Sequence, residues 1–178
     1  MQRKEITALL SDLLERDILG DSTWAREVKY SKLGIDGVGG RIDYMQFIPE
    51  VKDHYCATER SVQRGDFNVY EIKSDINDYM SGCGLNFIGD YNSLVMTMEL
   101  FKYLRQQRRI PYGIGVFVPV PMYTGKQPNS YFYSELCEPS KLTDDRTAWR
   151  LHKMIAPIKS CKCFHGTAEL LYAMLRAK

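Results

Sequence analysis

Apolar side chains recur every three or four positions over the first twenty residues, and this spacing predicts an amphipathic helix. The residues on its apolar face are Ile6, Leu9, Leu10, Leu13, Leu14 and Ile18. Gly20 ends the helix, and Asp21 and Ser22 favour a turn after it.

The pattern then changes to short apolar runs separated by glycine. Residues 24–33 and Arg41–Ile48 are predicted strands, and the segment between them carries four glycines between positions 34 and 40. These strands therefore form a predicted hairpin. Residues 49–65 are polar and mixed, which indicates a long loop with a short helical piece.

The middle of the chain alternates predicted strands and helices, and Ser74 is the expected N-cap of the first of these helices. In order, the elements are a strand at 66–73, a helix from 74 to the glycines at 82 and 84, a strand at 91–97, a helix at 98–109 and a strand at 113–119. This order predicts an α/β fold with a mixed central sheet flanked by helices.

After residue 120 the chain is rich in turn residues, with a predicted edge strand at 131–136 and helices near 143–155 and 167–176. A length of 178 residues fits one domain. We expect a core over about 1–119 and a C-terminal, largely helical extension over about 120–178.

Composition excludes several classes of protein. Hydrophobic residues make up 44% and charged residues 26%, which is typical of a globular protein. No apolar run reaches the length of a membrane span. Five scattered cysteines and no apolar leader predict free thiols in a reducing cytoplasm. The net charge of +2 excludes a generic polycation but allows an enzyme with a local basic face.

The candidate chemistry lies on two of the predicted strands. Glu71 and Lys73 are two residues apart on one strand, so they project to the same face. Asp43 can join them if its strand lies alongside. Two carboxylates suit a hard divalent cation such as Mg²⁺, and a neighbouring lysine can orient a water for attack on a phosphodiester. The alternative is a salt bridge across an edge strand.

Four segments resemble the PD-(D/E)xK nuclease superfamily, and within it the MmcB-like proteins of phages and bacteria. They are Arg41-Ile-Asp43, Val69-Tyr-Glu-Ile-Lys-Ser-Asp-Ile-Asn-Asp-Tyr79, Gly89-Asp-Tyr-Asn-Ser-Leu-Val95 and Pro111-Tyr-Gly-Ile-Gly-Val116. The resemblance covers about residues 24–119. It implies a restriction-endonuclease-like core, Asp43, Glu71 and Lys73 as catalytic residues, and Mg²⁺ or Mn²⁺ as cofactor.

The sequence also departs from the superfamily pattern. Ile42 stands before Asp43 where proline is common, and Asp75 adds a negative charge near Lys73 where relatives often carry serine. The additional carboxylate, which would be both a catalytic residue and a metal ligand, is not fixed by the pattern. Glu27 on the first strand is the preferred candidate. Glu15 should point to solvent, and Glu5 lies nearer the flank of the apolar face of the first helix.

Substrate contacts are expected from two further groups. Tyr91 could line the cleft, whereas Asp90 and Asn92 beside it favour simple turn chemistry. Lys102, Arg105 and Arg109 share a predicted helix face that could contact DNA phosphates. The alternative for these cations is a solvated outer face.

Residues 161–165 form a Cys-x-Cys-x-His run, which lacks the spacing and second ligand pair of a zinc site.

The sequence thus predicts a metal-dependent deoxyribonuclease of a phage or bacterium, acting in DNA repair, recombination or processing. In relatives this chemistry leaves a 5′-phosphate. DNA is the expected partner, and a homodimer is plausible because a duplex has two strands to cut. The alternative is a non-catalytic nucleic-acid-binding or assembly protein that retains the nuclease fold.

Overall fold

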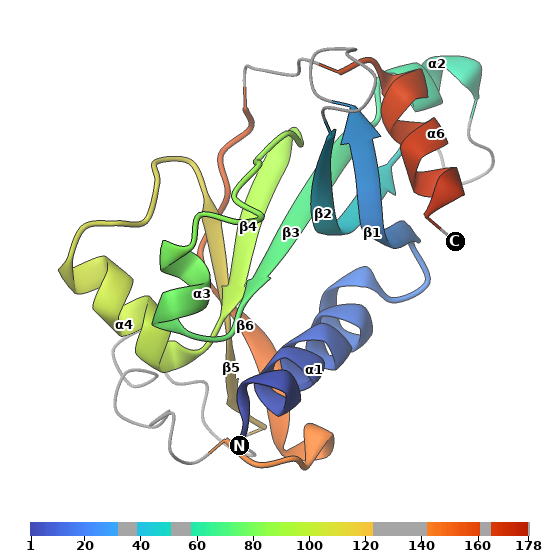
Figure 1. Cartoon of the computed structure of the whole chain (residues 1–178). Coiled ribbons are helices and arrows are strands. Elements are labelled where there is room, and N and C mark those ends of the chain that lie inside the picture. The colour runs from blue at the N-terminus through green and yellow to red at the C-terminus, as the bar shows by residue number, and fades with distance from the viewer. Residues whose placement is uncertain (32–38, 51–57, 123–141, 161–164, 178) are drawn as a thin grey trace. The chain divides into compact units, whose positions relative to one another are not determined.

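The computed structural model describes residues 1–31, 39–50, 58–122, 142–160 and 165–177. Six strands of these segments form one mixed sheet in the order β1-β2-β3-β4-β5-β6, with helices flanking it (Figure 1). The predicted α/β class and mixed sheet are confirmed at this level.

The elements follow the predicted order along most of the chain. The strands are β1 (Thr23–Ser31), β2 (Gly39–Ile48), β3 (Asp66–Lys73), β4 (Tyr91–Met96), β5 (Gly115–Pro121) and β6 (Trp149–Ile155). The α-helices are α1 (Arg3–Leu14), α2 (Glu59–Gln63), α3 (Ile76–Met80), α4 (Met98–Gln106) and α6 (Thr167–Arg176). A π-helical turn, η1 (Glu15–Leu19), continues α1, and a 3₁₀ turn, η3 (Arg146–Ala148), precedes β6.

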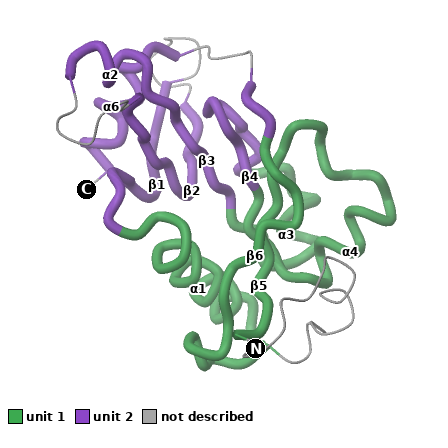
Figure 2. Tube along the Cα trace, turned by 180° about the vertical axis from the view of Figure 1, so that it is seen from behind, with its two compact units in different colours: residues 1–20, 72–83, 94–157 green, residues 21–71, 84–93, 158–178 purple. Residues whose placement is uncertain are grey.

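The chain divides into two compact units, which Figure 2 colours separately. Unit 1 comprises residues 1–20, 72–83 and 94–157, and unit 2 comprises residues 21–71, 84–93 and 158–178. The boundary crosses β3 and β4, so each of these strands contributes residues to both units.

Unit 2 is built around the antiparallel β1–β2 and β2–β3 pairs, with α6 packed on β1. Its core consists of Ala25, Val28, Tyr30, Ile42, Met45, Phe47, Phe67, Val69, Leu170, Ala173 and Met174. The inward-facing positions of β1 and β2 do not alternate strictly. Ala25 and Val28 both face the core, and Glu27 between them has φ +55°. The backbone at Glu27 therefore shifts which residues of β1 face inward.

Unit 1 contains the N-terminal helix and the antiparallel β5–β6 pair. The predicted apolar face of α1 is confirmed, since Leu9, Leu10, Leu13 and Leu14 are buried. The π-helical turn after α1 binds the backbone of β6. Arg16 Nη2 donates to the Trp149 carbonyl at 2.5 Å, and the Leu151 N–H donates to Asp17 Oδ2 at 2.7 Å. Because β6 is the last strand in the sheet, these contacts satisfy backbone groups along an edge.

The predicted helix near 143–155 is wrong. This segment forms η3 and then β6, in which Trp149 and Leu151 alternate as buried residues and pair with β5. Asp75, rather than Ser74, caps α3, because its carboxylate accepts the Asp78 N–H at 2.8 Å. The predicted edge strand at 131–136 lies outside the described residues.

Among the described residues, no helix combines the length and apolar character needed to cross a membrane.

Candidate functional site

Two of the predicted site carboxylates lie on neighbouring strands of unit 2. The continuous β2–β3 register runs from Ile48↔Asp66 to Tyr44↔Tyr70. The next residue along each strand is Asp43 on β2 and Glu71 on β3. Because the two strands run antiparallel, Asp43 and Glu71 are the first residues beyond the paired register on their strands.

Glu71 belongs to the interior of unit 2. It follows Phe67 and Val69 at two-residue intervals, so it continues the row of β3 side chains that faces the core. Its relative exposure is 0%, whereas Asp43 is half-buried. A carboxylate at full burial costs several kcal/mol unless nearby groups or an ion compensate for its charge.

Tyr30 is an aromatic neighbour of this carboxylate. Burial raises the pKa of the Tyr30 hydroxyl above its usual value, and the negative charge of Glu71 raises it further. The Tyr30 ring lies over Gly40, its partner on β2, where an added Cβ would overlap the tyrosine hydroxyl. Glycine at position 40 therefore makes room for the tyrosine, and a cross-strand pairing of this kind is not readable from the sequence.

Glu27, the preferred third carboxylate, forms a different contact. Its side chain pairs with Arg41, with 3.0 Å between Glu27 Oε2 and Arg41 Nη1, and both groups are largely exposed. Among the described residues, no group of three or more His, Cys, Asp or Glu side chains is close enough to hold a metal ion. The structure thus leaves Asp43 and Glu71 as the candidate oxygen ligands and does not assemble the three-carboxylate set.

Lys73 ends β3 and belongs to unit 1. It is 4% exposed, and its ammonium donates to the Cys83 carbonyl at 2.6 Å. Gly82, with φ +69°, lets the chain turn just before this carbonyl. A backbone group ten residues away in the sequence therefore holds the lysine amine, a contact that no side-chain pattern predicts.

Asp75 and Asp78 have structural roles in unit 1. Asp75 caps α3, and Asp78 Oδ2 accepts the Ser74 N–H at 3.3 Å. Arg3 on α1 forms ion pairs with both, at 3.5 Å to Asp75 and 2.7 Å to Asp78. The charge that Asp75 adds after Lys73 is thus partly balanced by Arg3.

Tyr91 lies at the start of β4, and the Lys159 ammonium is 5.9 Å from the centre of its ring. Lys159 also pairs with Asp66 at 2.5 Å, and this hydrogen bond raises the Lys159 pKa. One face of the Tyr91 ring is therefore occupied by a lysine of the same unit.

The turn chemistry expected beside Tyr91 is confirmed for Asn92, whereas Asp90 accepts a distant N–H from β3. The Asn92 side chain accepts the Gly89 N–H at 2.9 Å and donates to the Gly89 carbonyl at 2.8 Å. Asp90 Oδ2 accepts the Phe67 N–H at 2.9 Å. Both polar residues thus organise the backbone of unit 2.

The predicted basic face of α4 is shorter than expected. Lys102 and Arg105 are exposed on the helix, which ends at Gln106. Arg108 has φ +52°, so the chain has left the helix before Arg109. Arg109 Nη1 contacts the Met80 sulfur at 2.9 Å. Only Lys102 and Arg105 of the predicted set therefore share a helical face.

The comparisons with known proteins identify no relative. No protein-family model, no curated protein and no solved structure matches the chain. Its function is therefore inferred from its own residues and their geometry.

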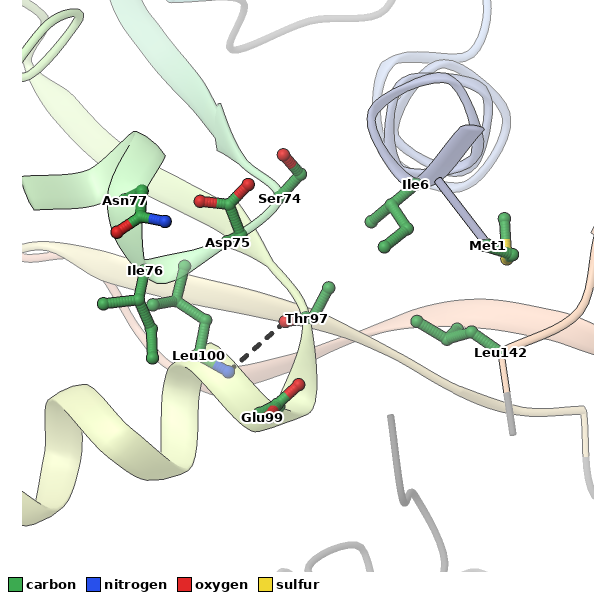
Figure 3. Close-up of a pocket in the computed structure, with 10 residues that line it drawn as sticks. All are labelled: Met1, Ile6, Ser74, Asp75, Ile76, Asn77, Thr97, Glu99, Leu100 and Leu142. Atoms are coloured by element: carbon green, nitrogen blue, oxygen red, sulfur yellow. Dashed lines mark hydrogen bonds between the residues drawn. The ribbon is translucent and has the colours of Figure 1, made fainter. Parts of the chain in front are cut away.

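A separate cavity of about 700 Å³ lies in unit 1 (Figure 3). Its walls are formed by Met1 and Ile6, by the start of α3, by the start of α4 and by Leu142. Thr97 caps α4 there, since its Oγ1 accepts the Leu100 N–H at 3.3 Å. Asp43, Glu71 and Lys73 do not line this cavity, so the predicted site and this hollow are formed by different residues.

Proposed function

We propose that the protein is a metal-dependent nuclease of the PD-(D/E)xK type that hydrolyses phosphodiester bonds in DNA. The observation that carries the proposal is the pair of carboxylates on adjacent antiparallel strands, Asp43 and Glu71, one of them at 0% exposure. Supporting it, the residue two positions after Glu71 is a buried lysine.

The donor set fits Mg²⁺ or Mn²⁺. Two carboxylate oxygens on neighbouring strands meet the preference of Mg²⁺ for a few hard ligands, while water completes its octahedral shell. Asp43 and Glu71 would hold the ion, and the burial of Glu71 would restrict the ways in which its carboxylate can turn. When bound, the ion would supply charge stabilisation to the phosphoryl oxygens.

Lys73 would act on the attacking water. An ammonium two residues after a metal ligand on the same strand can hold a water or a phosphate oxygen by hydrogen bonding. Its hydrogen bond to the Cys83 carbonyl fixes one of its three N–H groups and leaves two for this role. Lys102 and Arg105 on α4 would contribute contacts to the DNA backbone.

The second candidate is a nucleic-acid-binding or assembly protein that retains the nuclease fold without turnover. The absence of a group of three acidic or metal-binding side chains among the described residues favours it. The two candidates differ in one measurable property, which is metal-dependent cleavage.

The test uses the full chain with end-labelled single-stranded, duplex and branched DNA, in Mg²⁺, Mn²⁺ or EDTA. We expect metal-dependent products carrying a 5′-phosphate. Asp43→Asn, Glu71→Gln and Lys73→Ala should each lower the rate by about 10²-fold or more. Asp144→Asn removes a carboxylate from an exposed position and should leave the rate unchanged.

Circular dichroism and thermal melting must show that each variant is folded, especially Glu71→Gln because of its burial. Binding of DNA without cleavage on all three substrates would replace the nuclease proposal with the second candidate. Cleavage that survives Lys73→Ala and Asp43→Asn would assign the reaction to other residues.

A further inference from the structure

The outer face of α6 carries exposed apolar side chains. The helix turns Leu170, Ala173 and Met174 toward the core of unit 2. On the opposite face, Tyr172 and Leu175 are 62% and 64% exposed, and Ala168 lies on the same side by helical spacing, whereas Leu171 packs against the core. An amphipathic helix on a core would present polar residues there, so this face is unusually apolar.

Charged residues border this apolar face. Glu169, Tyr172 and Arg176 of α6 form one wall of a groove of about 560 Å³. Glu27 and Lys29 of β1 stand on the facing wall. The Arg176 guanidinium lies 5.8 Å from the centre of the Tyr172 ring. The groove thus combines two acidic and two basic side chains with an exposed aromatic ring.

This balance of charge argues for one kind of partner. DNA or an anionic membrane would require a surplus of cations, and a basic peptide would require a surplus of acids. A surface with equal numbers of both signs can complement itself. Two-fold symmetric interfaces require this property, because the same patch serves both subunits.

We propose that this surface binds a second copy of the chain, with the two α6 helices packed antiparallel about a two-fold axis. Glu169 and Arg176 are seven residues apart, so they lie on the same flank of the helix, about 10 Å apart along its axis. A two-fold axis that reverses the helix keeps that flank on one side. Centred between Tyr172 and Ala173, the pairing sets Glu169 of each copy opposite Arg176 of the other.

The apolar residues occupy the middle of this pairing. Tyr172 and Leu175 of the two copies lie between the two ion pairs and exclude water from them. A ten-residue helix and the adjoining groove form a small interface. The dimer is therefore expected to dissociate in the micromolar range. This dimer does not depend on the proposed nuclease activity.

The test measures the mass of the full chain by sedimentation equilibrium and by light scattering over about 1–200 μM, a range that spans the dissociation expected for a small interface. Wild type should form a dimer, and Leu175→Glu should abolish it. Glu169→Arg and Arg176→Glu should each weaken association by about 10-fold or more, because like charges then face each other twice. The double variant Glu169→Arg/Arg176→Glu should restore association to within about 3-fold of wild type.

The double variant is decisive, because Glu169 also lies 2.9 Å from His165 in its own chain and the single change alters that contact too. Glu99→Arg on α4 is the control, since it makes the same charge change on another exposed helical position. A wild-type monomer at every concentration would overturn the proposal. A dimer that persists in Leu175→Glu, or one that the double variant fails to restore, would overturn it as well.

Discussion

Gly89 illustrates how one missing side chain permits a close backbone contact. A Cβ at this position would lie 2.7 Å from the Phe67 carbonyl oxygen and 2.8 Å from Val69 Cγ2. Gly89→Ala should therefore lower the free energy of unfolding by about 1–3 kcal/mol, because backbone and core must shift. Urea denaturation measures the loss. Gly166→Ala, at a position with open space around the added Cβ, should change the stability by less than about 1 kcal/mol.

Tyr70 gives stability a dependence on pH. Burial raises the pKa of its hydroxyl to about 12, with an opposing hydrogen bond from Asn68. A raised pKa means that the folded state favours the neutral phenol. The contribution of the neutral Tyr70 phenol to the stability of the folded state is therefore fully present below about pH 10, the pKa of an unfolded tyrosine. It is lost as the pH rises toward 12.

Tyr70→Phe should remove this part of the pH dependence. The unfolding free energy of wild type, relative to that of the variant, should fall by an amount on the order of 2 kcal/mol between about pH 9 and pH 12. The comparison of the two proteins cancels the other tyrosines. A difference that stays constant with pH would show that the phenol ionises equally well in the folded state.

At the scale of single elements, the helix caps and the strand edge are the features that can be tested. Thr97 is 4% exposed and caps α4 through the Leu100 N–H. Thr97→Ala should cost about 1 kcal/mol of stability in thermal or urea unfolding. Thr7→Ala is the matched control on α1, where the hydroxyl donates only to the Arg3 carbonyl in an exposed turn. We expect it to change the stability by less than about 0.5 kcal/mol.

The contact between η1 and β6 supports a second prediction at this scale. Asp17 Oδ2 accepts hydrogen bonds from the Leu151 N–H and, at 3.0 Å, from Arg16 Nη2. Asp17→Ala should destabilise the protein by about 1–3 kcal/mol, because a charge-assisted bond to a strand N–H is lost. Chemical denaturation is the measurement, and Asp144→Ala serves as an exposed control. Equal stabilities of the two variants would contradict a role for Asp17 at this edge.

Elements with a local signal were predictable from sequence, whereas those defined by a distant partner were not. The strand predicted at 66–73 and the helix predicted at 167–176 have these bounds in the structure. In both, the spacing of apolar residues within the segment itself indicates the type of element and its buried face. The segment 149–155 lies within the helix predicted near 143–155 but forms a strand. Its identity as a strand depends on β5, about thirty residues earlier, and on Arg16 and Asp17 near the N-terminus.

The candidate site shows the same division. The spacing of Glu71 and Lys73 on one strand is a property of the sequence, and the antiparallel β2–β3 register confirms that the strand of Asp43 lies alongside. The contact of Glu27 with Arg41 could not be foreseen, because it depends on the neighbouring strand β2 and on the φ of +55° at Glu27, which no residue pattern signals. The hydrogen bond from Lys73 to the Cys83 carbonyl could not be predicted from the sequence either, because the acceptor is a backbone group.

At the scale of the whole molecule, the net charge of +2 means that the DNA affinity we propose would have to come from local cations. Lys102→Ala/Arg105→Ala should lower the slope of log affinity against log salt by about 2, if both side chains neutralise phosphates. Fluorescence anisotropy at several salt concentrations measures the slope. Lys4→Ala/Arg60→Ala removes the same charge from other exposed positions and should leave the slope unchanged. Equal effects of the two double variants would mean that DNA senses only total charge.

The hydrogen bonds that Arg16 and Asp17 make with the backbone of β6 have a consequence for folding during synthesis. Their bonding partners lie 133 and 134 positions further along the chain, so the ribosome has completed most of the polypeptide before these bonds can form. Until Trp149 and Leu151 have been synthesised, the Arg16 guanidinium and the Asp17 carboxylate of η1 lack these backbone partners. Chains truncated before Trp149 should therefore accumulate in inclusion bodies or be degraded, even though every residue of the candidate site has already been synthesised.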